Sequence, residues 1–296
     1  MKQIISFGTY ALIAPVLIAG VWLYATGALP SRMQKGEVVQ ETSDALDLEG
    51  IVLPQEGIML PIQWGNIGMQ MLDAGVVDEE KLKALYEDRG GLAEDMQKLL
   101  YESNAQEVRM TYENSGVILN LLWGFGLGNK NQVLEQGPMQ DSRYGGADRF
   151  ASTGGWTLAS GNVMDHYSMH PFVVLTPEQQ ALVEEVSKNI YRPCCGNSTY
   201  FPDCNHGMAM LGLLELMAAN GVSKEEMYKV ALQVNSYWFP DTYLTIAKYF
   251  AKQGVLWSEV SPQEALGNQY SSGSGYQRVR ALVEPVQQQG GGGCGL

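Results

Sequence analysis

The stretch of sequence that decides the fold is residues 208–219, which read MAMLGLLELMAA. Wound as a helix, this run presents apolar side chains on almost every side. A helix that is apolar all round is buried among other helices, because a helix at the surface needs a polar face. Residues 208–219 therefore predict the central helix of a mostly α-helical, bundle-like domain, whose elements are joined by long irregular loops.

Helix signals flank this central run on both sides. Capping boxes at Thr176 and Ser223 predict helices that run from there to about 190 and 239. Asp203 or Asn205 is the expected N-cap of the central helix, which ends at Gly221. Strand-like alternation is scarce, so the predicted class is mostly α. Further helices are expected over 66–74, 79–87, 92–101, 117–127, 242–253 and 262–266.

The loop before the central helix, residues 192–207, reads RPCCGNSTYFPDCNHG. It holds three of the four cysteines, Cys194, Cys195 and Cys204, together with His206, one of the three histidines. Three thiolates and an imidazole suit zinc or copper(I), and four such ligands can close a tetrahedral site. The helix N-terminus beside Cys204 favours its thiolate form. The sequence therefore predicts a transition-metal site here, used in metal handling or as a structural site.

The spacing Cys-Cys-x8-Cys-x-His departs from the paired C-x2-C of common zinc sites, which keeps two alternatives open. In the first, the protein is a thiol–disulfide oxidoreductase: Cys204 bridges Cys194 or Cys195, and the third sulfur attacks that bond. In the second, it is a membrane-tethered scaffold whose single structural disulfide braces the loop, with His206 as a polar helix cap. The sequence identifies no catalytic residue, because G-x-S-x-G and H-E-x-x-H patterns are absent from it. Whether the protein is an enzyme is left open.

The other two histidines, His166 and His170, are four residues apart, a spacing that places two ligands on one face of a helix. Pro171 disfavours helical backbone at His170 and weakens that interpretation. If the helix that begins at Thr176 packs with both its ends near the cysteine loop, the two imidazoles join the same site. His166 and His170 are therefore further candidate metal ligands, and the methionines of the central helix would favour copper.

The chain also carries a strong membrane signal, because residues 4–29 contain no charge. About 20 apolar residues cross a bilayer, whereas the apolar region of a cleaved signal peptide is about 7–15 residues long. We therefore expect residues 1–35 to be a retained, single-pass transmembrane anchor. The short amino-terminal flank favours a main domain outside the cytoplasm. The membrane is thus the partner that the sequence indicates.

The composition of the chain argues against nucleic acid as a partner and divides the sequence into segments. The formal net charge of −13 makes nucleic acid a poor partner, since its phosphates would be repelled. The predicted segments are an acidic tether (36–50), an N-terminal helical half (51–136), an irregular glycine-rich connector (137–161), a helical half with the Cys/His residues (162–286) and a disordered glycine-rich tail (287–296).

Overall fold

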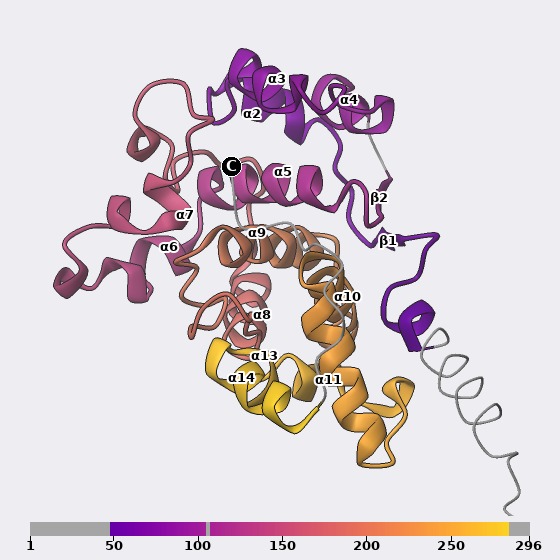
Figure 1. Cartoon of the computed structure of the whole chain (residues 1–296). Helices are drawn as coiled ribbons and strands as arrows, with labels where there is room; N and C mark the ends of the chain where they lie inside the picture. The colour runs from indigo at the N-terminus through magenta and orange to yellow at the C-terminus, as the bar shows by residue number, and fades with distance from the viewer. Residues whose placement is uncertain (1–47, 105–106, 284–296) are drawn as a thin grey trace, which may run out of the picture. The chain divides into compact units, whose positions relative to one another are not determined.

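Helices make up most of the chain that the computed structural model describes, residues 48–104 and 107–283, which confirms the predicted class (Figure 1). These residues belong to one compact unit, Ser43–Leu296. The helices are α2 (Ile67–Asp73), α3 (Glu79–Glu87), α4 (Glu94–Tyr101), α5 (Ser115–Gly128), α6 (Gln132–Gln136), α7 (Ala151–Gly154), α8 (Pro177–Ser187), α9 (Asn205–Ala219), α10 (Lys224–Trp238), α11 (Pro240–Lys252), α12 (Pro262–Ala265), α13 (Asn268–Ser271) and α14 (Gly273–Leu282). Short strands β1 (Ile58–Leu60) and β2 (Val108–Met110) accompany them, with 3-10 turns η1 (Pro138–Gln140), η2 (Ser142–Tyr144), η3 (Ala147–Arg149), η4 (Val163–Asp165) and η5 (Trp257–Glu259).

Helix α9 lies at the centre of the helices, as its apolar sequence predicts. Every residue from His206 to Ala218 is buried. Helix α5 runs beside α9, and α8 and α10 pack against it as well (Figure 1). A Cβ built on Gly212 of α9 would stand 2.6 Å from the carbonyl oxygen of Leu122 in α5, and Gly126 of α5 faces Gly212. Glycine at these positions lets the two central backbones approach closely.

Most of the predicted helix starts are confirmed. The side chain of Asp78 caps α3 by accepting a hydrogen bond from the backbone N–H of Lys81. Thr176 and Gln179 form the predicted capping box of α8, and the side chain of Ser223 caps α10. Because each of these signals is local, it can be recognised in the sequence without knowledge of the tertiary structure. Helix α8 ends at Ser187, before the predicted end at 190.

The predicted cap of α9 is wrong. Cys204 occupies the N-cap position and makes no side-chain cap hydrogen bond, while Asn205 is the first helical residue. The carboxylate of Asp203, one residue before that position, accepts instead from the side chains of Arg192 and Asn197. The beginning of α9 is therefore shaped by the cysteine loop.

Some elements are not predicted from the sequence. Strands β1 and β2 pair antiparallel, with Ile58 opposite Met110 and Leu60 opposite Val108, but three residues are too few for a period-two pattern to stand out. Helices α13 and α14 form where the sequence, rich in glycine and serine, is typical of turns. Helix α14 matters for the site, because its first residue contacts the cysteine loop.

The predicted anchor (1–35) and tail (287–296) lie outside the described residues, as does most of the tether. In the described part of the chain, no helix has both the length and the apolar character needed to cross a bilayer. The membrane anchor therefore stays a prediction. The two predicted halves meet where α5 packs along α9, and the connector between them holds η1, η2, η3 and α7.

Candidate metal site at the cysteine loop

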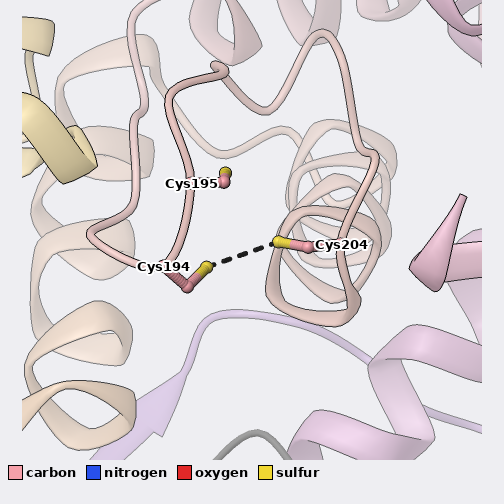
Figure 2. Close-up of side chains that lie close together, drawn as sticks. All are labelled: Cys194, Cys195 and Cys204. Atoms are coloured by element: carbon pink, nitrogen blue, oxygen red, sulfur yellow. Dashed lines mark hydrogen bonds between the residues drawn. The ribbon is translucent and has the colours of Figure 1, made fainter.

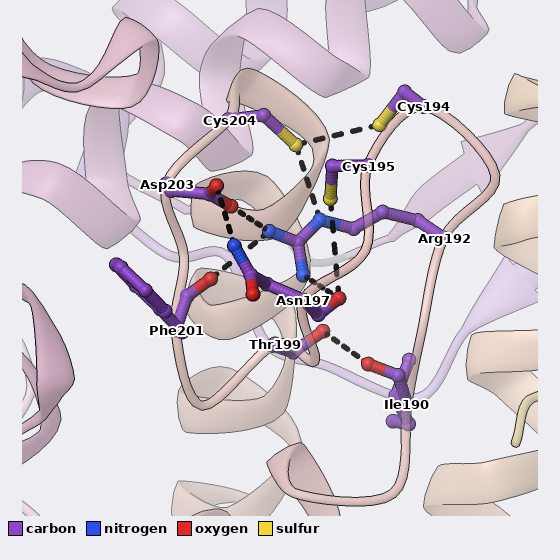
Figure 3. A network of polar contacts seen from close by, with 9 residues as sticks. All are labelled: Ile190, Arg192, Cys194, Cys195, Asn197, Thr199, Phe201, Asp203 and Cys204. Atoms are coloured by element: carbon purple, nitrogen blue, oxygen red, sulfur yellow. Dashed lines mark hydrogen bonds and ion pairs between the residues drawn. The ribbon is translucent and has the colours of Figure 1, made fainter. Parts of the chain in front are cut away.

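A loop that closes on itself carries the three cysteines between α8 and α9. Its base is fixed by Thr199, whose backbone N–H and hydroxyl donate to the carbonyl of Ile190 at 2.8 and 3.1 Å (Figure 3). An isolated antiparallel bridge between Tyr191 and Ser198 adds to this closure. The chain therefore reverses direction after 191 and returns to the beginning of α9.

The reversal brings three sulfurs together (Figure 2). The Sγ atoms of Cys194, Cys195 and Cys204 all lie within 4.8 Å of one another, and those of Cys194 and Cys204 are 3.4 Å apart. Cys194 is exposed, while Cys195 and Cys204 are partly buried. A zinc–sulfur bond is about 2.3 Å long, so two sulfurs on one tetrahedral ion stand about 3.8 Å apart. The observed cluster is close to that spacing, and could hold one ion after small movements of the side chains.

A buried arginine organises the loop around these sulfurs. The side chain of Arg192 is 1% exposed, and its Nε donates to the Sγ of Cys204 at 3.1 Å (Figure 3). Its two remaining nitrogens donate to the carbonyls of Asn197 and Phe201 at 2.9 and 3.0 Å, and to the carboxylate of Asp203 at 2.6 Å. A guanidinium can do this because its donors have a fixed planar arrangement.

Two further hydrogen bonds hold the loop in place, one within it and one from α14. The side-chain amide of Asn197 donates to the second carboxylate oxygen of Asp203 at 2.7 Å. The backbone N–H of Gly273, the first residue of α14, donates to the carbonyl of Cys195 at 2.7 Å. Cys195 is thus supported from the carboxyl-terminal helices, and Asp203 from within the loop.

The three thiols of the cluster differ in pKa. Hydrogen bonds from the thiols of Cys194 and Cys195, together with the positive charge of Arg192 and a bond from His206, hold the pKa of Cys204 well below its usual range in spite of burial. Hydrogen bonding to Cys195 and Cys204 raises the pKa of Cys194. For Cys195, the contact with Cys194 lowers the pKa, but the contact with Cys204 and burial outweigh it and bring the value to about 11. Cys204 is therefore the thiolate that pairs with Arg192.

Of the three predicted histidine ligands, His206 lies nearest to this cluster. Its ring packs against Phe239 and Trp238 with centroid distances of 4.4 and 5.6 Å, and it hydrogen bonds to Cys204. It also lines a cavity of about 700 Å³ beside α5. Within the described residues, the group of ligand atoms within 4.8 Å of one another consists of the three sulfurs, and His206 stands beside it.

His166 and His170 form a pair with each other instead of joining the sulfurs. Their facing ring nitrogens are 3.1 Å apart, and neither belongs to the group of converging ligand atoms in the described chain. The expected common site required both ends of α8 to approach one ion. With eleven residues, α8 is about 16 Å long, at about 1.5 Å per residue. The two ends of α8 therefore lie well apart, and the ring nitrogens of the histidines face each other and not the sulfurs.

Arg192, Asn197 and Asp203 also belong to the site, although the sequence did not predict them there. A signal for two of them is present, because Arg192 and Asp203 are the charged residues of an otherwise uncharged loop, apart from His206. Opposite charges next to clustered cysteines indicate an ion pair that is partly removed from water. The role of Asn197 depends on the path of the backbone and has no such signal.

Comparison with known proteins identifies no family for this chain. Set against models of protein families, curated proteins and solved structures, the chain matches none.

Proposed function

We propose that this protein binds one thiophilic transition-metal ion, copper(I) or zinc, through the thiolates of Cys194, Cys195 and Cys204. The observation that carries the proposal is that three sulfurs from two separate segments lie within 4.8 Å of one another. Thiolates are the ligands that select copper(I) and zinc among biological metals. The positive charge of Arg192 beside Cys204 would offset part of the negative charge of a three-thiolate site.

The choice between the two metals depends on a fourth ligand. Structural zinc takes four ligands in a tetrahedron, and His206 is the side chain next to Cys204 that could complete such a set. Copper(I) is satisfied by soft sulfur ligands, so three thiolates would hold it without His206. Because the converging ligand atoms are three sulfurs, copper(I) fits the site with the smaller rearrangement.

Metal handling is the use that the exposure of the site favours. Cys194 is exposed, so an ion held there can pass to or from another carrier by exchange of thiolate ligands. A purely structural ion is normally enclosed on all sides by its ligands. We further propose that this exchange takes place outside the cytoplasm, next to the membrane that residues 1–35 would anchor.

A specific observation supports thiol–disulfide exchange as the second candidate. The sulfurs of Cys194 and Cys204 are 3.4 Å apart, and a disulfide bond of about 2.05 Å would need only a modest approach of the two atoms. Cys195 would then be the third sulfur, placed to attack that bond. A structural disulfide without exchange would use the same pair.

The experiment that tests the proposal measures metal on the full chain, purified in detergent without oxygen. By elemental analysis, we expect the parent chain to contain about one copper or zinc ion more per chain than Cys194→Ser, Cys195→Ser and Cys204→Ser. Cys294→Ser is the matched control, because Cys294 is the fourth cysteine of the chain, and it should keep the ion. His206→Gln should weaken zinc binding and spare copper(I).

Two outcomes would overturn the proposal. A chain that contains no metal, takes up neither copper(I) nor zinc when titrated, and carries a reducible bond between Cys194 and Cys204 would establish the disulfide instead. Reduction of a disulfide substrate such as insulin would then separate an oxidoreductase from a structural bridge. Equal metal content in Cys204→Ser and Cys294→Ser would place the ion elsewhere.

A further inference from the structure

A second group of metal-ligating side chains lies away from the cysteine loop. The Nδ1 atom of His166 and the Nε2 atom of His170 face each other at 3.1 Å. A tight turn produces this contact, because Ser168 between them adopts a left-handed backbone with φ of 55°. The two histidines therefore meet without the helix that their spacing suggested.

The turn is fixed firmly to the end of α5. The backbone N–H groups of Ser168 and His170 donate to the carbonyls of Leu127 and Gly128 at 2.8 and 2.9 Å, and the carbonyl of His170 accepts from Lys130 at 2.9 Å. The ring of His170 also stacks on Phe172, with a centroid distance of 5.2 Å. Backbone and ring contacts thus hold the imidazole of His170 in place.

The hydrogen bonds of His166 determine which of its nitrogens can bind an ion. Its Nε2 lies 2.9 Å from the carbonyl oxygen of Ser160. A carbonyl only accepts, so the proton of His166 is on Nε2, and Nδ1 offers its lone pair toward His170. A metal-binding histidine commonly donates its other N–H to a carbonyl in this way.

We infer that His166 and His170 form a second, separate metal site, which takes a divalent ion that prefers imidazole, such as Cu²⁺, Ni²⁺ or Zn²⁺, completed by water. Two imidazole nitrogens bound to one ion at about 2.0–2.1 Å stand about 3 Å apart, close to the observed separation. His166 is buried and His170 is partly exposed, so the ion would enter from the side of His170. The inference goes beyond the proposed function, since it involves no sulfur.

The proton balance of this site is simple. When the pair stands alone, Nε2–H of His170 donates to Nδ1 of His166. An ion takes the lone pairs of both nitrogens, so the proton of His170 moves to its own Nδ1. Binding therefore releases no net proton, and the ring tilts to direct both lone pairs at the ion.

The experiment uses the full chain with all four cysteines changed to serine, so that the thiol site cannot contribute. We expect one Cu²⁺ ion per chain, with hyperfine splitting from two nitrogens in the electron paramagnetic resonance spectrum. His166→Gln and His170→Gln should each weaken Cu²⁺ binding about tenfold or more. Glu225→Gln is the control, because it changes an exposed side chain of α10 that belongs to neither proposed site.

The result is independent of the fate of the thiol proposal. If the serine variant does not fold, the same histidine substitutions are measured by Ni²⁺ titration of the parent chain with its thiols blocked. Unchanged affinity in His170→Gln would overturn the inference. So would unchanged affinity in His166→Gln.

Discussion

The guanidinium of Arg192 lies directly against the backbone of Gly207: a Cβ built on Gly207 would stand 2.5 Å from the Cζ of Arg192. Real Cβ atoms do not approach other heavy atoms so closely, so a side chain at 207 would displace the guanidinium or move α9. Position 207 therefore requires glycine because of a neighbour fifteen residues earlier, although it lies in the first turn of a helix.

Gly207→Ala should destabilise the protein. Alanine normally stabilises a helix interior by about 1 kcal/mol relative to glycine, but overpacking a filled site costs about 1–3 kcal/mol. We expect the second effect to prevail, because the guanidinium is held by four hydrogen bonds and cannot swing away. Urea unfolding of the purified chain measures the difference.

The matched control for this variant is Gly116→Ala, near the beginning of α5. Apart from its chain neighbours and the nearby backbone of α5, a Cβ there would have no heavy atom of the described chain within 4 Å. Its free energy of unfolding should stay the same or rise by up to about 1 kcal/mol. If both variants were stabilised equally, the packing of Arg192 on Gly207 would not be what constrains position 207.

Arg192→Gln should lower the free energy of unfolding by about 3 kcal/mol, the scale expected when one partner of a buried ion pair is removed. The loss arises because Asp203 and the Cys204 thiolate would keep their negative charge without the cation that faces them. Changing Asp203 to Asn in the same chain should recover part of the stability, since one uncompensated charge is then gone. Identical unfolding curves for Arg192→Gln and the parent would show that the buried cation does not stabilise the loop.

The ionisation of Cys204 gives a separate prediction. Its pKa lies below the usual range because the neighbouring thiols donate to it and Arg192 is close, so the reduced, metal-free chain should contain one thiolate well below pH ~8.5, the ordinary thiol pKa. Absorbance of thiolate in the far ultraviolet, followed against pH, measures it. The other two thiols of the cluster should ionise at higher pH.

Two variants check the assignment of that thiolate. Cys204→Ser should remove the low-pH step altogether. Arg192→Gln should move the step to higher pH, because a positive charge beside the sulfur is lost. Because the pKa of Cys204 is lower in the folded chain than in the unfolded chain, its ionisation stabilises the native state at high pH. This stabilisation is lost as the pH falls through the folded pKa.

The sequence predicted those features that local signals encode. Thr176, Ser223 and Asp78 mark helix starts by their own side chains, and the apolar run of α9 marks burial without reference to any other segment. The residue types Cys194, Cys195 and Cys204 likewise indicated thiol chemistry before their positions were known.

Other features depend on the path of the backbone and could not be predicted in that way. The left-handed turn at Ser168 brings His166 and His170 into contact, whereas a four-residue spacing suggested a helix. The contact of Arg192 with Gly207 joins a loop to the helix that comes after it, and neither residue type implies it. The separation of the histidines from the sulfurs also depends on the backbone, because the length of α8 does not determine where the segments before and after it run.

A buried carboxyl lies in the middle of α9. Glu215 is fully buried, and its Oε2 accepts a hydrogen bond from the side-chain amide of Asn129. Burial raises the pKa of Glu215 to about 8, although the amides of Asn129 and Asn131 lower it. The carboxyl is therefore mostly protonated at neutral pH in the folded chain, whereas an unfolded glutamate ionises near pH ~4.3.

Glu215→Gln should make the protein less sensitive to pH. Between the unfolded and the folded pKa, the native chain holds a proton that the unfolded chain releases, so the free energy of unfolding falls as pH rises from about 4.3 to about 8. At ~1.4 kcal/mol per pH unit, the total is of the order of 5 kcal/mol at most. A glutamine side chain cannot ionise, so the free energy of unfolding of the variant should increase relative to that of the parent as pH rises. Urea unfolding at pH 5 and pH 8 measures this, with Glu225→Gln on the exposed face of α10 as the matched control. A parent chain that is equally stable at both values would show that Glu215 titrates in its ordinary range.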